Sequence, residues 1–262
     1  MYKLGLALSG GGVKGAVHAG VLKCLEEHKI TPNIVSGTSA GAIVGALYAS
    51  GIKGDEILNF FLNERPYSTS MWAGKSGLLA TSQIREVFEK YISHDSFQAL
   101  ETQLITCATN MLSGKVEYFE KGSLIDAALA SASFPGVFSP MEIGDQLYSD
   151  GGLLNHFPAD VLAGDCKVLI GVHLSPNKPL TKNDLASTRS ILSRAIDIQG
   201  SAMEVEKLEL CDISIFPEEL IQYSTFDFDK EKMHEMFEIG YAYMASNMDK
   251  LKTLLNSSCD TN

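Results

Sequence analysis

The sequence predicts an α/β fold in which a largely parallel or mixed sheet is covered by helices on both faces. Three observations support this prediction. Short apolar runs of strand length alternate with longer runs of helical periodicity. The first two apolar runs each end in a glycine-containing turn that opens into a helix, which is typical of parallel strands. No repeat, low-complexity tract or long linker interrupts the alternation, so we expect residues 1–262 to form one domain.

The N-terminal part of the chain shows the alternation most clearly. A strand near 3–8 is followed by a glycine-rich turn and by a helix that continues to about residue 29. A second strand near 33–36 leads through another tight turn into a small-residue helix that ends near residue 50. Two strand–turn–helix units in succession favour parallel pairing in this part of the sheet.

Turn and capping residues delimit the later elements. Ser113-Gly114 and Gly144-Asp145 each separate two apolar runs and predict short hairpins. Thr81 or Ser82, and further on Ser123, precede helical runs and suit N-cap positions. In chain order, the later elements are expected as helices at 55–61 and 82–92, strands at 102–110 and 115–120, a helix at 124–132, strands at 141–143, 146–149 and 167–172, a helix at 184–209, a strand at 212–216 and a helix at 229–252.

The least regular segment is 64–80, which contains the only tryptophan of the chain, Trp72, between glycines. Two interpretations remain open for it. It is either a plain surface loop or a flap that faces the substrate and touches a lipid interface.

Composition and charge narrow the classes of protein to consider. The net charge of −11 and the pI of about 5.0 argue against broad nucleic-acid binding and against purely electrostatic docking on anionic membranes. Five scattered cysteines without a C-x-x-C pair favour reduced thiols. The chain shows neither a signal-peptide pattern nor an uninterrupted apolar run of about 18 residues, so we expect a cytoplasmic protein, at most peripheral to membranes.

Ser39 has the setting of an activated nucleophile. It occupies the pentapeptide Gly-Thr-Ser-Ala-Gly at 37–41, between an apolar run and a small-residue helical run. A nucleophile elbow needs this strand–tight turn–helix context, and glycine on both sides lets the chain and the helix approach closely. The hydroxyl is then expected at a helix N-terminus, where partial positive charge stabilises developing negative charge.

A second glycine-rich turn, residues 10–15, follows the first strand and opens the first helix. It matches G-x-G-x-x-G, but the second strand ends without the acidic residue that a dinucleotide site uses to hold a ribose. We therefore interpret Gly10, Gly11 and Gly12 as backbone donors of an oxyanion hole. Lys14 opposes the helix macrodipole here, and either an ion pair with a nearby acid or contact with an anionic substrate group would account for it.

The serine needs a base, and the residues leave more than one choice open. Asp150 follows a short apolar strand, and burial together with a direct bond to the serine hydroxyl would raise its low pKa. His156 and His173 are rivals, because one follows Asp150 closely and the other ends a buried-type strand. The other histidines do not follow strand ends, where a triad base normally lies. They are His18, His28, His94 and His234.

In order, the glycine-rich turn, the serine pentapeptide and the aspartate turn resemble the motifs of the patatin-like phospholipase family. That family carries G-G-G-x-[K/R]-G, G-x-S-x-G and D-G-[G/A]. Residues 130–140 before the aspartate strand and residues 152–159 after it also resemble family segments. The resemblance covers roughly residues 3–175, and the C-terminal part, with helices expected at about 184–252, carries no recognised motif.

The resemblance implies a three-layer α/β/α sandwich and a serine acyl hydrolase that works through a Ser–Asp dyad without histidine. Ser39 would be the nucleophile, and Asp150 the base that takes its proton. Amides from the Gly10–Gly12 stretch, above all those of Gly11 and Gly12, would form the oxyanion hole. The glycines that would support the elbow and the aspartate turn are Gly37, Gly41, Gly151 and Gly152.

The expected substrate is a lipid or another acyl ester. We expect neither a metal ion nor an organic cofactor, because no His, Cys and Asp cluster has ligand spacing. His156 stands where similar sequences often have Asn, which leaves a Ser–His triad esterase as an alternative. An acyltransferase would use the same serine, and a non-catalytic lipid-binding module is a third alternative. Transient membrane-surface contact through 64–80 is a further hypothesis, and nothing in the sequence indicates an oligomeric state.

Overall fold

The computed structural model describes residues 1–64, 81–176, 179–187, 190, 191, 194, 195, 198, 204, 206–226 and 228–257, with only the backbone of 81–83. Within these residues, eight strands form one mixed sheet with the order β5-β6-β3-β2-β1-β7-β8, in which β4 also pairs with β3. The strands are β1 (Tyr2–Leu8), β2 (Ile34–Thr38), β3 (Gln103–Asn110), β4 (Lys115–Phe119), β5 (Met141–Ile143), β6 (Gln146–Asp150), β7 (Cys166–Val172) and β8 (Ile213–Ile215).

The pairing explains why the sheet is mixed. Strands β3, β2, β1, β7 and β8 are parallel neighbours, whereas β4 and β6 pair with β3, and β5 with β6, in antiparallel fashion. The described helices are α1 (Gly15–Glu27), α2 (Ala40–Ala49), α3 (Gly54–Asn63), α4 (Thr81–Glu89), α5 (Leu124–Ser131), α7 (Lys230–Ser246) and α8 (Met248–Ser257). Short 3-10 turns are η1 (Gly12–Lys14), η3 (Phe97–Ala99), η4 (Gly151–Leu153), η5 (Asn183–Leu185) and η6 (Glu218–Gln222).

The central strands bury both faces, as the alternation of side chains in β1 shows. Leu4, Leu6 and Leu8 point into the main core, which also contains apolar residues of α1 to α5 and α7. Ala7 points to the opposite face, into a smaller core that includes Phe157 from the segment after η4. The sheet therefore lies between a thick helical layer and a thinner layer made largely of turns. The predicted α/β fold with a covered central sheet is confirmed.

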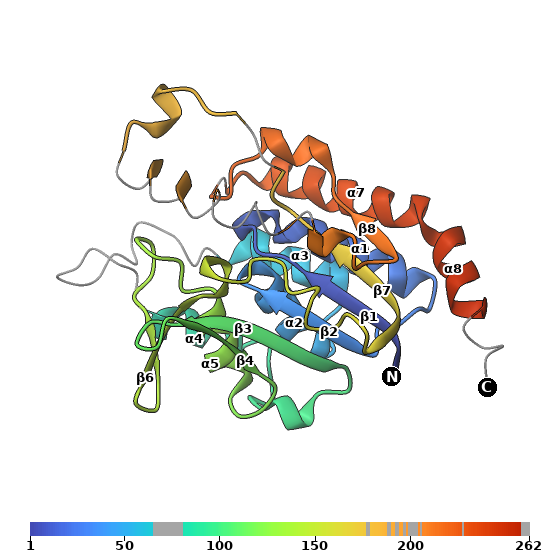
Figure 1. Ribbon diagram of the computed structural model, residues 1–262, viewed down its shortest axis with the longest axis horizontal. Coiled ribbons are helices and arrows are strands. Elements are labelled where there is room, and N and C mark those ends of the chain that lie inside the picture. The colour runs from blue at the N-terminus through green and yellow to red at the C-terminus, as the bar shows by residue number, and fades with distance from the viewer. Residues whose placement is uncertain are drawn as a thin grey trace.

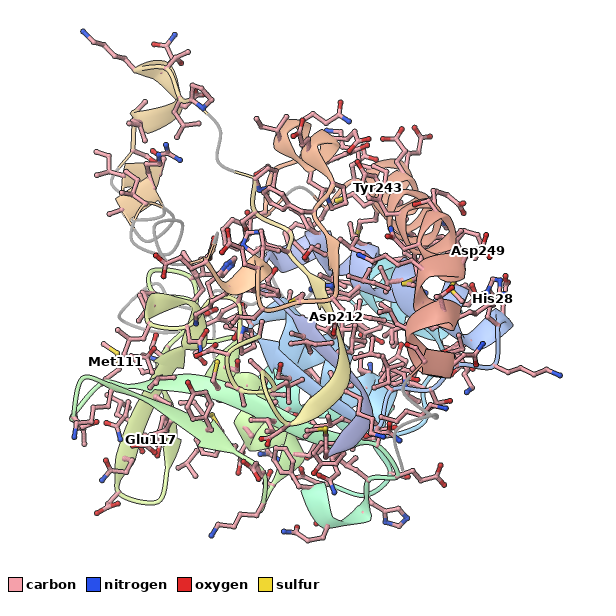
Figure 2. All side chains as sticks on the ribbon, turned by 45° about the vertical axis from the view of Figure 1, so that its right-hand side comes forward. His28, Met111, Glu117, Asp212, Tyr243 and Asp249 are labelled. Atoms are coloured by element: carbon pink, nitrogen blue, oxygen red, sulfur yellow. The ribbon has the colours of Figure 1, made fainter. Side chains whose placement is uncertain are left out.

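Helices α1 and α7 cross at two glycines, one on each helix. A Cβ on Gly20 would collide with the Phe237 carbonyl, and a Cβ on Gly240 would collide with the Val17 carbonyl. Each helix thus packs directly on the backbone of the other, which only glycine permits. Figure 1 shows α7 and α8, in orange and red, running beside β7 and β8. In Figure 2, Tyr243 and Asp249 on these helices lie on the opposite side of the molecule from Met111 and Glu117 of the β3–β4 hairpin.

Most predicted elements are confirmed, and the C-terminal part differs. The helix expected at 229–252 is two helices, because the Asn247 side chain donates to the Tyr243 carbonyl at 2.8 Å and ends α7. Of the helix expected at 184–209, the structure describes only η5 and scattered residues, so this prediction falls largely outside the described residues. The predicted loop or flap at 64–80 also lies outside the described residues, apart from Glu64. The same is true of the side chains of Thr81 and Ser82, the predicted N-cap residues. No described helix is long and apolar enough to cross a membrane.

Candidate active site

Ser39 joins β2 to α2 in a backbone conformation that few residues adopt. Its φ of 52° and ψ of −117° are strained for a residue with a side chain. A Cβ on Gly37 would collide with the Gly41 carbonyl, and a Cβ on Gly41 would collide with the Leu8 carbonyl at the end of β1. The Ser39 carbonyl accepts from the Ile43 amide at 3.0 Å and so begins the helix. The serine thus lies in a sharp strand–turn–helix connection that requires both glycines.

Asp150 ends β6 and meets Ser39, with β3 between their strands. The Ser39 hydroxyl donates to Asp150 Oδ2 at 2.6 Å, and the Gly152 amide donates to Asp150 Oδ1 at 2.7 Å. The Asp150 amide donates to the Ser133 carbonyl at 3.0 Å, and the Thr109 hydroxyl donates to the Asp150 carbonyl at 2.9 Å. The carboxylate is therefore fixed from both sides, and the serine hydroxyl lies within direct bonding distance.

Burial controls the protonation of Asp150, which is only 3% exposed. Burial raises the pKa of Asp150 from 3.8 to about 6, while hydrogen bonds from Ser39 and Gly152 and positive charge on His156 oppose the rise. At neutral pH the carboxylate is mostly ionised, and it is a stronger base than an exposed aspartate. A base with a pKa near the working pH is suited to accept a proton from a hydroxyl.

The glycine-rich loop lies beside this pair, and its amides differ in their partners. The Gly10 amide donates to the His156 carbonyl at 3.0 Å and is therefore engaged. Among the described residues, the amides of Gly11 and Gly12 donate to no other group. A Cβ built on Gly10 would lie 3.3 Å from the Ser39 Cβ, so the loop is next to the serine. Gly11 and Gly12 are thus the loop residues whose amides have no partner in the described part of the chain.

Sequence reasoning missed Ser131, which completes the support of the elbow. The Ser39 amide donates to Ser131 Oγ at 2.9 Å and is not available to a substrate. The segment 130–140 resembles the family, but nothing in the pattern assigned a role to this serine. Lys14 is buried, and its charge adds to the effect of burial in lowering the pKa of the His173 ring. Both interpretations of Lys14 stay predictions.

No imidazole takes the place of Asp150 beside the Ser39 hydroxyl in the described part of the chain. His156 Nδ1 and His173 Nε2 instead bond to Glu204, at 2.7 and 2.8 Å. His18 is fully buried, and burial lowers its pKa to about 3, so it is neutral and donates to the Ser9 carbonyl. The exposed histidines are His28, His94 and His234.

One group of described residues has the donor set of a metal site. The ligand atoms of His156, His173 and Glu204 lie within 4.8 Å of one another, and their sequence separations gave no sign of it. The proton positions do not suit a metal. The Ser175 amide donates to His173 Nδ1 at 3.4 Å, which leaves the proton on Nε2, where Glu204 accepts it. A metal ligand needs that nitrogen without its proton.

A narrow apolar pocket opens next to the dyad. Three of its lining residues connect it to the site: Ile43 comes one turn after Ser39, Ala132 follows Ser131, and the Ser133 carbonyl accepts from the Asp150 amide. The remaining lining is almost entirely apolar. It consists of Phe60, Phe61, Glu64, Ile84, Phe88, Leu129, Phe138 and Phe228.

Comparisons with known proteins identify the family of the chain. The patatin-like phospholipase family model matches residues 6–163. An uncharacterized NTE family protein of Mycobacterium tuberculosis is 28% identical over 210 residues, which cover 78% of this chain and 58% of the relative. Lysophospholipase NTE1 of Eremothecium gossypii is 24% identical over 283 residues, 95% of this chain and 18% of that protein. The chain thus spans little more than half of the mycobacterial relative. The crystal structure of VipD from Legionella pneumophila aligns with a TM-score of 0.48 at 15% identity, over 98% of this chain and 67% of VipD.

Proposed function

The chain belongs to the patatin-like phospholipase family, and we propose that it hydrolyses acyl esters of lipids through a covalent acyl-serine intermediate. Asp150 takes the hydroxyl proton as Ser39 Oγ attacks the ester carbonyl. The amides of Gly11 and Gly12 hold the oxyanion of the tetrahedral intermediate. Asp150 then gives the proton to the leaving alcohol. A water molecule, deprotonated by the same carboxylate, releases the fatty acid and restores the serine.

The observation that carries this proposal is the 2.6 Å bond from the Ser39 hydroxyl to a buried carboxylate whose pKa is raised to about 6. An exposed carboxylate with a pKa near 4 would accept a serine proton poorly. Here burial raises the basicity, and the direct bond lets the proton move without an intervening group. The strained backbone of Ser39 supports the same role, because such conformations concentrate at functional sites.

The apolar pocket supports a lipid substrate. Ile43, four positions after Ser39, lines it together with several aromatic rings. We place the acyl chain there, because the lining residues Ala132 and Ser133 directly follow Ser131, whose hydroxyl accepts from the Ser39 amide. One relative is named a lysophospholipase, so lysophospholipids and phospholipids are the first substrates to test. We further propose that residues 1–262 act as a single catalytic domain.

The test is hydrolysis of a panel of phospholipids, lysophospholipids and p-nitrophenyl esters by wild type, Ser39→Ala and Asp150→Asn. Both variants should lose nearly all activity and keep the wild-type circular dichroism spectrum. A fluorophosphonate probe should label wild type but not Ser39→Ala. Ser50→Ala is the matched control, since Ser50 caps the far end of α2 and its hydroxyl bonds to no described residue. Full activity of Asp150→Asn together with its loss in His173→Ala would replace the dyad by a serine–histidine pair.

Acyl transfer remains the second candidate, because the acyl-serine is common to both reactions. Added alcohols or lysolipids should leave the fatty acid as the main product of a hydrolase. A product in which the acyl group is mainly on the acceptor would identify a transferase.

The membrane contact predicted through 64–80 lies almost wholly outside the described residues and stays a proposal, as does location in the cytoplasm. A change in Trp72 fluorescence on adding neutral lipid vesicles would support the contact.

A further inference from the structure

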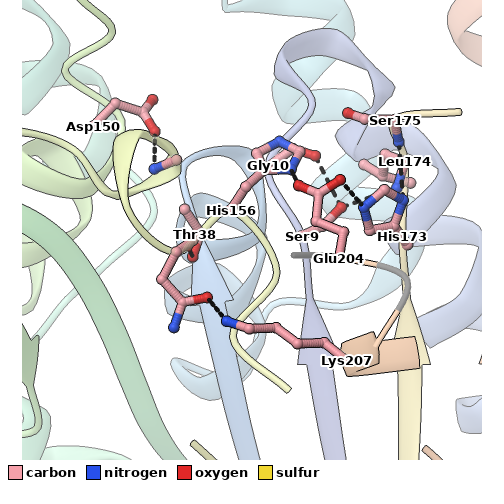
Figure 3. A network of polar contacts seen from close by, with 12 residues as sticks. Ser9, Gly10, Thr38, Asp150, His156, His173, Leu174, Ser175, Glu204 and Lys207 are labelled. Carbon is pink, nitrogen blue, oxygen red and sulfur yellow. Dashed lines mark hydrogen bonds and ion pairs between the residues drawn. The ribbon is translucent and has the colours of Figure 1, made fainter. Parts of the chain in front are cut away.

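Glu204 bridges two histidines next to the glycine-rich loop. It accepts from His156 Nδ1 through Oε1 at 2.7 Å and from His173 Nε2 through Oε2 at 2.8 Å. The carboxylate and the His173 ring are buried, and the His156 side chain is 18% exposed. Figure 3 shows Glu204 entering from the C-terminal part of the chain and lying between the two rings. This carboxylate comes from a segment that carries no family motif.

The bridge has a defined chemical state. Burial of Glu204 favours its neutral form, but the hydrogen bonds from both imidazoles hold the pKa of its carboxyl well below the usual range. The Ser175 amide donates to His173 Nδ1, so the ring carries its proton on Nε2 and can donate it to Glu204. A buried, ionised carboxylate that receives two donors holds both rings in place. The His156 ring is therefore oriented through Nδ1.

The His156 ring in turn touches both loops of the dyad. A Cβ on Gly10 would lie 2.6 Å from His156 Nε2, and a Cβ on Gly152 would lie 3.2 Å from His156 Cδ2, so the ring lies directly against both backbones. The Gly10 amide also donates to the His156 carbonyl. Gly10 precedes the two proposed oxyanion donors, and Gly152 donates to the Asp150 carboxylate. One ring thus lies between the backbone of the oxyanion loop and the turn that orients the base.

We propose that Glu204 is a positioning residue that, by holding the His156 ring between Gly10 and Gly152, keeps the oxyanion amides and the Asp150 carboxylate aligned with Ser39. This inference rests on the function proposed above. Glu204 and His173 contact neither Ser39 nor Asp150 in the described residues, so both act through His156. The C-terminal part of the chain then supplies a group on which the catalytic geometry depends.

The charge of His156 gives the proposal a second readout, the pH–rate profile. Positive charge on His156 lowers the pKa of Asp150, while burial raises it. In the described part of the chain, the other charged or titratable groups near these residues are Glu204, His173 and His18 beside His156, Lys14 near His173, and Cys107, Asp160 and Lys207 near Asp150. Removal of the imidazole therefore moves the acid limb of the pH–rate profile to higher pH, whereas a loss of packing alone would not.

Two amide substitutions remove the ring that lies between Gly10 and Gly152. His156→Asn keeps an N–H near the site of Nδ1, where it can donate to Glu204, whereas His156→Gln places its N–H near the site of Nε2. Both variants should lower the high-pH plateau of kcat about 10- to 100-fold, the loss expected when catalytic groups are displaced by less than about 1 Å, and both should shift the acid limb upward.

The direct test is Glu204→Gln, which keeps the shape and removes the charge that accepts both donors. Its plateau kcat should fall about 10-fold or more with KM within about twofold, and Glu204→Asp should recover part of the loss. Glu206→Gln, exposed on the same segment, is the control and should match wild type. The melting temperature of each variant is measured to show that it folds. If Glu204→Gln does not fold, the kinetics of His156→Asn and His156→Gln test the proposal instead.

Two results would overturn the proposal: a wild-type plateau and acid limb in Glu204→Gln, or a wild-type plateau in His156→Asn or His156→Gln. Either result, with Ser39→Ala inactive, would refute only the positioning role and leave the hydrolase intact. Retained activity in Ser39→Ala would instead refute the proposed function itself.

Discussion

Ser39 Oγ lies 2.6 Å from Asp150 Oδ2, although 111 positions separate the two residues in the chain. The sheet register explains this proximity. β3 pairs with β2 so that Cys107 lies opposite Thr38, and with β6 so that Ala108 lies opposite Asp150. Adjacent residues of one central strand therefore set the positions of the serine turn and the aspartate. The dyad geometry depends on strand pairing more than on either loop.

The rate should depend on the protonation of Asp150. The carboxyl must be ionised to accept the Ser39 proton, and its pKa is raised to about 6 by burial. We expect kcat/KM for a non-ionising ester to rise with pH through a limb near pH 6 and then to level off. The measurement is a pH–rate profile of wild type. A limb that is abolished in His173→Ala, but not displaced in His156→Asn, would assign the titration to a histidine instead.

Asp150 should also destabilise the folded protein at neutral pH. Its folded pKa of about 6 exceeds the ordinary value of 3.8, so its stabilising contribution is complete below about pH 4 and is lost as the pH rises through 6. Asp150→Asn should therefore raise the free energy of unfolding at pH 8 by up to about 3 kcal/mol, from a shift of about two pKa units. Urea unfolding at pH 8 and pH 4 checks this, and an equal difference at both values would contradict it.

Gly41→Ala should damage the elbow. The new Cβ would meet the Leu8 carbonyl, a backbone group that cannot move aside. We expect a loss of about 1–3 kcal/mol in stability from overpacking and about 100-fold slower labelling of Ser39 by a fluorophosphonate. Gly45→Ala is the control on the same helix, because its Cβ would meet the mobile end of the Leu104 side chain at 2.8 Å. Equal labelling rates for the two variants would show that close approach at residue 41 is not needed.

Ala132→Phe should change chain-length preference. Ala132 lines the apolar pocket beside the dyad, and a phenyl ring there would fill the space proposed for the acyl chain. Hydrolysis of p-nitrophenyl laurate should fall at least about 10-fold, with little change for p-nitrophenyl acetate, because each lost methylene contact is worth about 1–3 kcal/mol. Ala99→Phe, at an exposed position, controls for the added ring. Parallel losses on both esters would place the acyl chain elsewhere.

The sequence predicted those helices, strands and turns that depend on neighbouring residues in the chain. The glycines at 37 and 41 and the apolar run before them indicated a sharp turn at Ser39, and the structure has a positive φ there. The end of α7 at Asn247 was missed, because Asn is tolerated inside helices and only its bond to Tyr243 reveals the break. Apolar spacing does not record such a contact.

The surroundings of the site were predictable only in part. Ser39 and Asp150 lie in turns with recognisable spacing, and the structure places them together. Glu204 lies in a segment without a motif, and its partners are 31 and 48 positions away, so no window of sequence relates them. Ser131 was hidden for a similar reason, because its hydroxyl acts on the backbone of a residue 92 positions earlier.

The glycine contacts between α1 and α7 connect the end of the chain with its beginning. α1 starts directly after the loop that carries the proposed anion donors, and the backbone of α7 lies against it at Gly20 and Gly240. A protein truncated before Lys230 would expose that seam to water and leave the first helix without its main neighbour. The final helices, far in sequence from Ser39 and Asp150, would thus be as indispensable to turnover as the motifs themselves.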